Sequence, residues 1–441
     1  MTRLFGTDGV RGVANVDLTP DLVLALGRAA GQVLGSHGEE VVIGRDTRLS
    51  GPMLEGALMA GLSSAGATVR LAGVVPTPAV AFLTVEDGAA AGAMISASHN
   101  PVPDNGIKFF SADGVKLSEG VEDEIERAME RGPGELPQGL RVGHCERMSD
   151  AHDRYIDHLL SITERLKGIR VVLDCAFGAA WKVGPRAFRE AGADVVAINA
   201  EPDGARINVD CGSTSLGGLA RRVLEEGADL GLGFDGDADR VLAVDERGTV
   251  LDGDRILTVL ASGLHEAGQL KEDLVVTTVM SNLGFLRAMR ERGIEVLTAP
   301  VGDKYVGEEM TRVGAVIGGE QSGHVILAQH STTGDGILTG LQLASHLVAS
   351  DEPLSELAGG WETFPQTVIN VGVKDRGGLE AATAVWDEVR SVEAELGDDG
   401  RVLLRASGTE PVVRVMVEAD TERHAREAAE RLASAVQTHL A

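Results

Sequence analysis

Residues 20–73 read PDLVLALGRAAGQVLGSHGEEVVIGRDTRLSGPMLEGALMAGLSSAGATVRLAG, and two kinds of pattern alternate in them. An amphipathic helical pattern covers residues 20–36, and a second helical stretch lies near residues 52–65. Short apolar runs follow them, VVIG at 41–44 and TVRLAG at 68–73. Helical periodicity that alternates with short apolar runs is typical of α/β layers with largely parallel sheets. We therefore predict an α/β fold for this part of the chain.

The same alternation continues along most of the chain. Further apolar runs occupy residues 91–98, 171–174, 194–199, 230–234, 274–280, 294–300 and 315–319. The periodicity is lost over residues 132–152, which we interpret as a linker, and a second change of unit falls at residues 248–255. From about residue 366 the pattern becomes a strand, a helix at 377–396, strands at 401–405 and 412–419, and a terminal helix at 420–439. This last order of elements predicts a smaller α+β domain.

Length and charge limit the classes of function. The chain has 441 residues, which corresponds to about two to four domains. Its formal net charge of −27 argues against nucleic acid and anionic membranes as partners, because like charges repel. An anionic substrate would need a local cluster of Arg and Lys side chains.

Cysteine usage and the absence of targeting patterns favour a cytoplasmic location. Cys145, Cys175 and Cys211 form no CxxC pair, and a sparse, odd set is typical of a reducing compartment. The first residues, MTRLFGTDGVRG, contain no apolar signal-peptide core. The sequence also contains no run of about 18 apolar residues that would predict a membrane-spanning helix.

An acidic cluster follows the apolar run LGLGF. The segment GFDGDADRVLAV at 233–244 places Asp235, Asp237 and Asp239 at alternate positions, where side chains of an extended segment point the same way. Three converging carboxylates favour a hard divalent cation such as Mg²⁺. A solvated acidic turn is the plainest alternative.

Two other interpretations of this segment fit less well. A calcium loop of the EF-hand type would need Gly at its sixth position, which is Arg240, and a helix where VLAV predicts a strand. The match of GLGFDG to the dinucleotide fingerprint GxGxxG fails because a helix does not follow it.

A candidate nucleophile lies in ISASHNPVPDNGIKFF at 95–110. Ser98, His99 and Lys108 group a hydroxyl, an imidazole and an ammonium after an apolar strand, where α/β folds usually carry their chemistry. Neighbouring side chains rarely face each other, so a serine-hydrolase arrangement is not expected. The alternative is a structural turn in which Ser and Asn cap a following helix.

Two further loops suit anions and sugar hydroxyls. RASGTEPVVRV at 405–415 resembles a phosphate clamp, with a plain hairpin turn as the alternative. Its candidate residues are Arg405, Ser407, Gly408, Thr409 and Arg414. GGEQSGH at 318–324 groups a carboxylate, a hydroxyl and an imidazole, with a helix N-cap followed by a buried His as the alternative. Its candidate residues are Glu320, Ser322 and His324.

Glycine-flanked arginines occur in two N-terminal segments. FGTDGVRG at 5–12 carries Arg11. GRDTRLSG at 44–51 carries Arg45 and Arg48, and we expect Arg48 on a surface turn.

Together these loops resemble the α-D-phosphohexomutase superfamily, most closely its phosphoglucosamine branch. The motifs SASHNP, DGDADR, GEQSGH and RASGTEP occur in the family order over essentially the whole chain. FGTDGVRG and the Gln of GEQSGH are similar to the phosphoglucosamine branch, whereas phosphomannomutase/phosphoglucomutase relatives usually differ there. The resemblance implies four domains: three similar α/β domains with mixed, mostly parallel sheets and a smaller C-terminal α+β domain. We expect them at residues 1–150, 151–250, 251–365 and 366–441.

The resemblance also implies roles for the candidate residues. Ser98 would carry the phosphoryl group, and the three aspartates would bind one Mg²⁺ with an oxygen of phospho-Ser98. Glu320 and Ser322 would read sugar hydroxyls. The distal phosphate clamp would consist of Arg405, Ser407, Gly408 and Thr409. Positions that contact the substrate or assist proton transfer would be Arg11, His99, Lys108 and His324, with Arg240 helping to neutralise phosphate.

The implied reaction interconverts glucosamine 6-phosphate and glucosamine 1-phosphate through a 1,6-bisphosphate intermediate, with a hexose or hexosamine 1,6-bisphosphate as activator. Lys108 or His99 is the candidate general base. The expected partner is a small hexosamine phosphate, without nucleic acid or membrane, and the oligomer, including a homodimer, stays open. The alternatives are a phosphomannomutase/phosphoglucomutase of the same superfamily, a metal-dependent phosphatase and a catalytically silent sugar-phosphate-binding protein.

Overall fold

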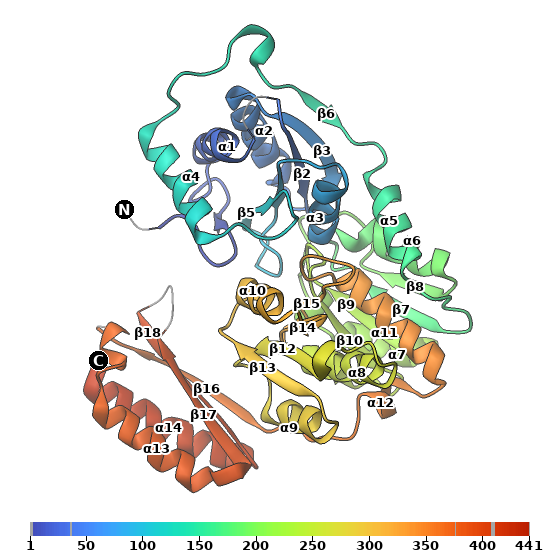
Figure 1. The fold of residues 1–441 in the computed structure, drawn as a ribbon. Coiled ribbons are helices and arrows are strands. Elements are labelled where there is room, and N and C mark those ends of the chain that lie inside the picture. The colour runs from blue at the N-terminus through green and yellow to red at the C-terminus, as the bar shows by residue number, and fades with distance from the viewer. Residues whose placement is uncertain (1–2, 36–37, 375, 407–410, 441) are drawn as a thin grey trace. The chain divides into compact units, whose positions relative to one another are not determined.

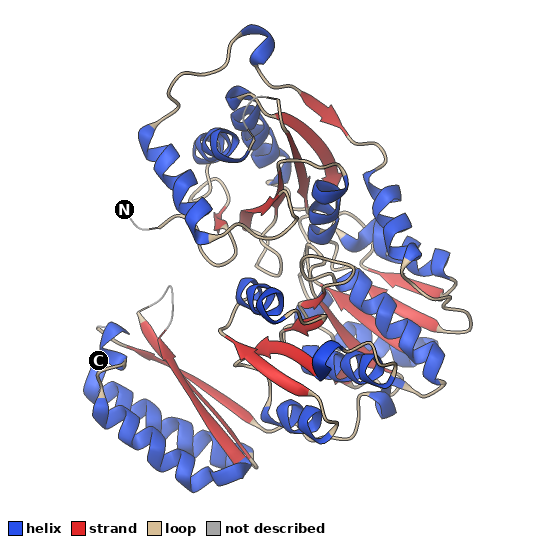
Figure 2. Ribbon diagram, in the orientation of Figure 1, coloured by secondary structure: helices blue, strands red, loops and turns tan. Residues whose placement is uncertain are grey.

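The computed structural model describes residues 3–35, 38–374, 376–406 and 411–440. The chain forms two compact units, Met1–Thr278 with Leu297–Gly359 and Val279–Val296 with Gly360–Ala441. Helices and strands alternate through most of it, as Figures 1 and 2 show. In the part of the chain described here, no helix combines the length and the apolar character needed to cross a membrane.

The first sheet contains six strands and is mixed. Its order is β1 (Val10–Val13), β5 (Asp104–Ser111), β4 (Ala91–Ile95), β2 (Glu40–Arg45), β3 (Thr68–Val74) and β6 (Cys145–Arg147). The strand β2 pairs in parallel with β3 and β4, whereas β5 is antiparallel to β4 and β1. The accompanying helices are α1 (Pro20–Leu34), α2 (Gly51–Ala65), α3 (Thr77–Glu86), α4 (Glu119–Arg131) and the 3-10 turn η1 (Gly139–Arg141).

The predicted linker at 132–152 is only partly irregular. Its strand β6 pairs in parallel with β3 and extends the first sheet at its edge. All three residues of β6 are exposed, so the strand has no buried apolar face and leaves no alternating pattern in the sequence.

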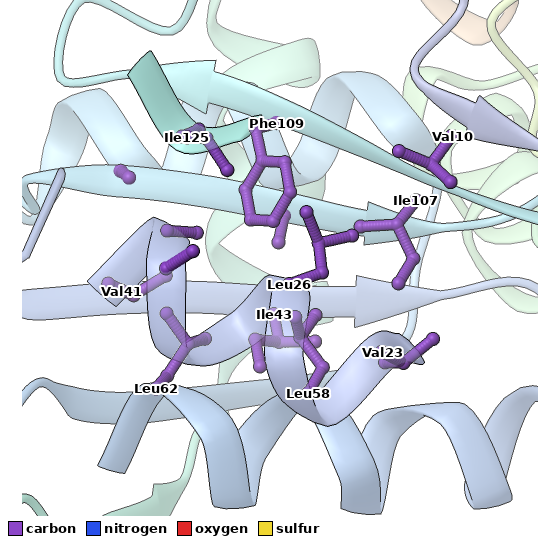
Figure 3. Packing of buried hydrophobic residues seen from close by; sticks show 14 of the residues in the cluster. Val10, Val23, Leu26, Val41, Ile43, Leu58, Leu62, Ile107, Phe109 and Ile125 are labelled. Carbon is purple, nitrogen blue, oxygen red and sulfur yellow. The ribbon is translucent and has the colours of Figure 1, made fainter. Parts of the chain in front are cut away.

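A continuous apolar core joins α1, α2 and α4 to the first sheet. Leu26 of α1 lies among Ile43 and Leu58, and Phe109 and Ile125 belong to the same cluster (Figure 3). The helix α1 begins where Thr19 Oγ1 accepts a hydrogen bond from the backbone nitrogen of Leu22 at 3.3 Å, with Pro20 at its first position.

The second sheet has the order β11 (Val250–Leu251), β10 (Val241–Asp245), β9 (Leu230–Phe234), β7 (Arg170–Asp174) and β8 (Asp194–Ile198). The strand β7 is parallel to β8 and β9, and β9 and β10 form an antiparallel hairpin. The hairpin confirms that VLAV is a strand, so neither a helix-flanked calcium loop nor a dinucleotide turn forms here. Its helices are α5 (Ala151–Ser161), α6 (Ala180–Ala191), η2 (Gly212–Thr214) and α7 (Gly217–Glu226).

The third sheet has four strands. Its order is β13 (Glu295–Ala299), β12 (Leu274–Thr278), β14 (Ile317–Gly319) and β15 (Val325–Leu327). The strands β12 and β14 are parallel, and β14 and β15 are antiparallel. The helices of this region are α8 (Gly253–Glu266), η3 (Lys271–Asp273), α9 (Leu283–Glu291), α10 (Asp303–Val313), α11 (Gly336–Ser350) and α12 (Leu354–Leu357).

The C-terminal part is an antiparallel sheet with two long helices. The sheet order is β16 (Gln366–Gly372), β18 (Val412–Ala419) and β17 (Gly400–Ala406). Its helices are η4 (Arg376–Leu379), α13 (Thr383–Leu396), η5 (Gly397–Asp399) and α14 (Glu422–Leu440), with α13 and α14 side by side against the sheet (Figure 1). The helix predicted from residue 377 begins only at Thr383, because two consecutive glycines are poor helix formers.

Candidate active site

Ser98 follows β4 in a buried turn. Its backbone has a φ of 52°, in the left-handed region that residues other than glycine rarely adopt. Its Oγ donates a hydrogen bond to Asp235 Oδ2 at 2.5 Å and lies 3.2 Å from His99 Nδ1. The expectation that neighbouring side chains face apart is wrong here, because Ser98 Oγ and His99 Nδ1 lie within hydrogen-bond distance. The segment then enters the strand β5, so it does not cap a helix.

Arg48 contradicts the prediction of a surface turn, because its side chain is fully buried. Its Nε donates to Asp46 Oδ2 at 3.0 Å. Its other four N–H groups donate to backbone carbonyl oxygens at 2.6–3.0 Å, those of Ser98, Asn100, Pro101 and Asp104. One guanidinium therefore holds the whole turn that carries Ser98.

Other side chains that the sequence did not single out also hold this turn. Asn208 Nδ2 donates to the Ser98 carbonyl at 2.8 Å. Ser96 Oγ accepts from the Ser98 backbone nitrogen at 2.8 Å and donates to Asp46 Oδ2 at 2.7 Å. Burial raises the pKa of Asp46 to about 6, and the Arg48 guanidinium offsets only part of this rise. No local motif indicates these contacts, since their partners lie far apart in the sequence.

The three predicted metal ligands converge in the turn between β9 and β10. Asp235, Asp237 and Asp239 are buried, and each has a carboxylate oxygen within 4.8 Å of the other two. Lys108 Nζ, on β5, donates to Asp237 Oδ2 and Asp239 Oδ2 at 2.9 Å each. Thr77 Oγ1 donates to Asp237 Oδ2 at 2.6 Å.

The pKa values of the carboxyl groups in this cluster shift in opposite directions. Burial, followed by the charges of Asp239 and Asp237, raises the pKa of Asp235 well above its usual value. Burial alone would raise the pKa of Asp239 too, but the Lys108 ammonium holds it well below its usual value. Burial alone would lower the pKa of Lys108, whereas Asp237 and Asp239 raise it above its usual range. Lys108 is therefore a cation at neutral pH.

The donor set fits a hard divalent cation. Asp237 Oδ1 and Asp239 Oδ1 are buried and have no hydrogen-bond partner among the described residues. A buried carboxylate oxygen without a partner is costly, and coordination to a cation removes that cost. Oxygen ligands of this kind suit Mg²⁺.

Two arginines and a histidine surround the cluster. Arg240 Nε lies 3.9 Å from Asp239 Oδ1, and Arg11 Nη1 on β1 lies 3.4 Å from Asp8 Oδ2. The Nε atoms of both arginines are buried without a hydrogen-bond partner in the described part of the chain. Burial, followed by the charges of Arg240 and Arg11, lowers the pKa of His99 to about 4. These groups provide donors that suit a phosphate.

The GEQSGH segment forms the turn of the β14–β15 hairpin. Glu320 Oε1 accepts from the backbone nitrogen of Gly302 at 3.2 Å, and Ser322 Oγ donates to Glu320 Oε2 at 3.4 Å. Burial raises the pKa of Glu320. His324 is buried, with its Nδ1 3.8 Å from Asp239 Oδ2. A strand and not a helix follows, so the helix N-cap alternative is wrong, and the hairpin reaches the acidic cluster.

The predicted phosphate clamp lies in the C-terminal unit. Arg405, near the end of β17, lies opposite Arg414 of β18 in the sheet register. Burial, followed by the charge of Arg414, lowers the pKa of Arg405. Two neighbouring guanidinium groups repel each other unless an anion lies between them. Ser407, Gly408 and Thr409 lie outside the described residues.

Models of the four domains of the phosphoglucomutase/phosphomannomutase family match the chain in order. The α/β/α domains I, II and III match residues 2–134, 153–248 and 252–364, and the C-terminal domain matches residues 368–435. These matches confirm the predicted architecture of three α/β domains followed by a smaller, different domain.

Relatives of high similarity cover nearly the whole chain. A phosphoglucosamine mutase of Salinispora tropica is 55% identical over 99% of this chain and 99% of its own length. A phosphoglucosamine mutase of Rhodococcus opacus is 54% identical with the same coverage. Among solved structures, a phosphoglucomutase/phosphomannomutase family protein from Burkholderia thailandensis is 25% identical with a TM-score of 0.84, covering 100% of this chain and 98% of that one. The chain is thus a mutase that belongs to the phosphoglucosamine mutase branch of the phosphoglucomutase/phosphomannomutase family.

Proposed function

We propose that this enzyme interconverts glucosamine 6-phosphate and glucosamine 1-phosphate, with Ser98 as the phosphoryl carrier. The observation that carries the proposal is the contact of 2.5 Å between Ser98 Oγ and Asp235 Oδ2 inside a buried cluster of three aspartates. The names of the relatives at 54–55% identity favour this substrate over those of the phosphomannomutase/phosphoglucomutase alternative. The product would supply amino-sugar precursors of the cell wall.

The reaction would consist of two phosphoryl transfers. The free hydroxyl of the sugar phosphate attacks the phosphorus of phospho-Ser98, the new O–P bond forms, and the bond from phosphorus to Ser98 Oγ breaks. The resulting 1,6-bisphosphate reorients, and Ser98 Oγ takes the other phosphoryl group. Such transfers depend mainly on in-line positioning and on stabilisation of negative charge.

Charge balance assigns roles to the surrounding cations. Three carboxylates carry about −3, and a phosphoserine adds about −1.5 to −2. A Mg²⁺ ion held by Asp235, Asp237 and Asp239, with an oxygen of phospho-Ser98, would offset about two of these charges and polarise the phosphoryl group. Lys108, Arg11 and Arg240 would supply the remaining positive charge.

The geometry favours His99 over Lys108 as the group that takes the proton from the attacking hydroxyl. The Lys108 ammonium donates to two carboxylates at 2.9 Å and stays protonated, so it suits charge stabilisation. The His99 ring nitrogen lies 3.2 Å from Ser98 Oγ, within reach of a group that reacts there.

Sugar and distal phosphate would be read by separate loops. Glu320 and Ser322 would bind sugar hydroxyls, and His324 would face the same site from the hairpin that reaches Asp239. Arg405 and Arg414 would bind the distal phosphate together with Ser407, Gly408 and Thr409. A small hexosamine phosphate is then the partner, and a trace of hexose or hexosamine 1,6-bisphosphate would activate the enzyme by phosphorylating Ser98.

We further propose a cytoplasmic location, which the three cysteines without disulfide bonds support.

The test is a mutase assay with Mg²⁺ and a trace of hexose 1,6-bisphosphate on glucosamine 6-phosphate, glucose 6-phosphate and mannose 6-phosphate. We expect a clear preference for the glucosamine substrate and no turnover by Ser98→Ala, with an unchanged circular dichroism spectrum. Preference for glucose or mannose would overturn the substrate, and substantial turnover by Ser98→Ala would overturn the carrier. Inorganic phosphate released faster than the 1-phosphate would indicate a phosphatase.

A further inference from the structure

Lys116 forms ion pairs between two α/β domains, largely buried toward Asp303 and partly exposed toward Asp8, outside the groups that transfer phosphoryl. Its Nζ donates to Asp303 Oδ1 at 2.7 Å and to Asp8 Oδ1 at 3.0 Å. Lys116 and Asp8 lie in the segment that matches domain I, and Asp303 lies in the segment that matches domain III. Burial alone would lower the pKa of Lys116, but Asp303 and Asp8 raise it. The ammonium therefore keeps its charge inside the protein.

Asp303 is the first residue of α10. Gly302 and Asp303 lie close to Glu320 and His324, the two ends of the turn between β14 and β15. The backbone nitrogen of Gly302 donates to Glu320 Oε1 at 3.2 Å. The carboxylate of Asp303 lies 3.6 Å from His324 Nε2. Gly302 has a φ of 132°, which side-chain-bearing residues rarely adopt, so the turn has one specific backbone shape. A displacement of Asp303 would also move the neighbouring Gly302 nitrogen, which donates to Glu320.

The next residue of α10 provides a matched comparison. Lys304 Nζ lies 3.7 Å from Glu122 Oε2 of α4, and both side chains are largely buried. This pair also joins α10 to domain I. Among the described residues, however, the Lys304 side chain makes no hydrogen bond to Glu320 or His324.

Stability alone is a poor explanation for the Lys116 cluster. Removing charges from water costs several kcal/mol per ion, and apolar replacements of buried ion pairs are often neutral or stabilising. An ion pair forms a directional link between two atoms, whereas an apolar contact does not. That link ends here on the turn that holds the Glu320 carboxylate.

We propose that Lys116 is a positioning residue, whose pair with Asp303 holds the start of α10 and so aims Glu320 at the substrate sugar. The inference rests on the proposed function, because it gives Glu320 the role of sugar reader. Loss of the pair loosens the sugar, while the hydrogen bonds that Arg48 and Asn208 donate to the Ser98 turn remain.

The test is a double-mutant cycle between Lys116→Met and Glu320→Gln, measured as kcat/KM for glucosamine 6-phosphate. We expect Lys116→Met to lower kcat/KM by up to about a hundredfold, mainly through KM, as a misplacement of about 1 Å can do. In the Glu320→Gln background the same change should cost little, because residues that act through one another are not additive. Lys116→Arg should recover part of the loss, and Lys304→Met should stay close to the wild type.

Three results would overturn the inference: additive effects of the two substitutions, an equal loss in Lys304→Met, or Lys116→Met with unchanged kinetics. If Lys116→Met does not fold, Asp303→Asn cuts the same pair from the other side and serves in the same cycle. Hydrolysis of phospho-Ser98 by water, without sugar, should proceed at the wild-type rate in Lys116→Met and in Lys304→Met. Failure of the proposed function is distinct, since the wild type itself would then lack mutase activity.

Discussion

At the scale of single residues, the turn that carries Ser98 depends on contacts from far along the chain. A non-glycine residue with a left-handed backbone costs on the order of 1–3 kcal/mol and persists where its surroundings hold it. At Ser98 the carbonyl accepts hydrogen bonds from Arg48 and Asn208, and the backbone nitrogen donates to Ser96. These contacts keep Ser98 Oγ beside Asp235 before any substrate binds.

Replacement of Arg48 should therefore damage both stability and turnover. Arg48→Met leaves the buried Asp46 without its cation, which should lower the free energy of unfolding by about 3–5 kcal/mol. Arg48→Lys should not restore turnover, because an ammonium has three donors and cannot reach all five acceptors. Urea unfolding and mutase kinetics check both expectations.

The double variant Arg48→Met with Asp46→Asn separates the two effects. It should recover stability, since the uncompensated charge is gone, but its kcat should stay low because the turn has lost its donors. Arg70→Met, which breaks a partly exposed pair with Glu40 at 3.0 Å, is the control and should change little. Full kcat in the double variant would contradict the role given to Arg48.

At the scale of elements, close packing of α1 against α2 relies on glycine. A Cβ on Gly61 of α2 would lie 2.4 Å from the backbone oxygen of Leu24, whereas a Cβ on Gly56 would meet nothing within 4 Å. Helix propensity favours Ala over Gly by about 1 kcal/mol at both positions. We expect Gly56→Ala to stabilise by about that amount and Gly61→Ala to destabilise by about 1–3 kcal/mol through overpacking.

Denaturant unfolding of the two alanine variants checks this expectation. Since both substitutions add the same methyl group to the same helix, their difference isolates the contact with α1. Equal stabilisation by both would show that the helices separate without cost.

The start of α11 should make stability depend on pH. Asp335 accepts a hydrogen bond from the Leu338 backbone nitrogen at 2.9 Å and another from the Tyr155 hydroxyl at 2.6 Å. Burial raises its pKa from 3.8 to about 6. The folded state therefore holds a proton that the unfolded state has released. The stabilisation is complete below the unfolded pKa and is lost as the pH rises through about 6.

Asp335→Asn provides the reference for this effect, because Asn also caps helices and does not titrate. The stability of the wild type relative to the variant should fall by about 1 kcal/mol between about pH 5 and about pH 7. Urea unfolding of both proteins at a series of pH values gives the difference directly. A difference that is constant or rises with pH would contradict the assignment.

At the scale of the whole molecule, the chain has separate cores. The apolar cluster of the C-terminal unit includes Leu432 and Val436 of α14, and it is distinct from the cluster around Leu26. Leu432→Ala should cost about 2–5 kcal/mol because the side chain is fully buried. Calorimetry should show more than one transition, and this substitution should lower only the transition of the C-terminal unit. A uniform shift of the whole profile would show cooperative unfolding of the entire chain.

The distribution of charge is also a property of the whole molecule. The chain carries a formal net charge of −27, yet Arg11, Lys108 and Arg240 gather around the acidic cluster. In the proposed function, these local cations would bind an anionic substrate against an unfavourable overall field.

The sequence by itself determined the class of fold and the order of three similar α/β domains and a smaller C-terminal one, and it contains the four motifs. These features can be predicted from short stretches of sequence. Hydrophobic periodicity follows the repeat of each helix or strand, and each motif is contiguous. The runs at 41–44, 68–73 and 230–234 are strands, and 20–36 and 52–65 cover α1 and α2. The strand β6 was missed because it is exposed and has no apolar pattern, and the start of α13 was placed too early because the two glycines at 377–378 were included in the helix.

Only the tertiary structure decided how the site is held together. Arg48, Asn208 and Thr77 contact the Ser98 turn or the acidic cluster from 50, 110 and 160 residues away, so no window of sequence reveals them. An arginine in a polar loop looks the same whether it faces water or five acceptors. Burial and charge pairing, which decide between these states and set the pKa values of the cluster, exist only once distant segments have packed together.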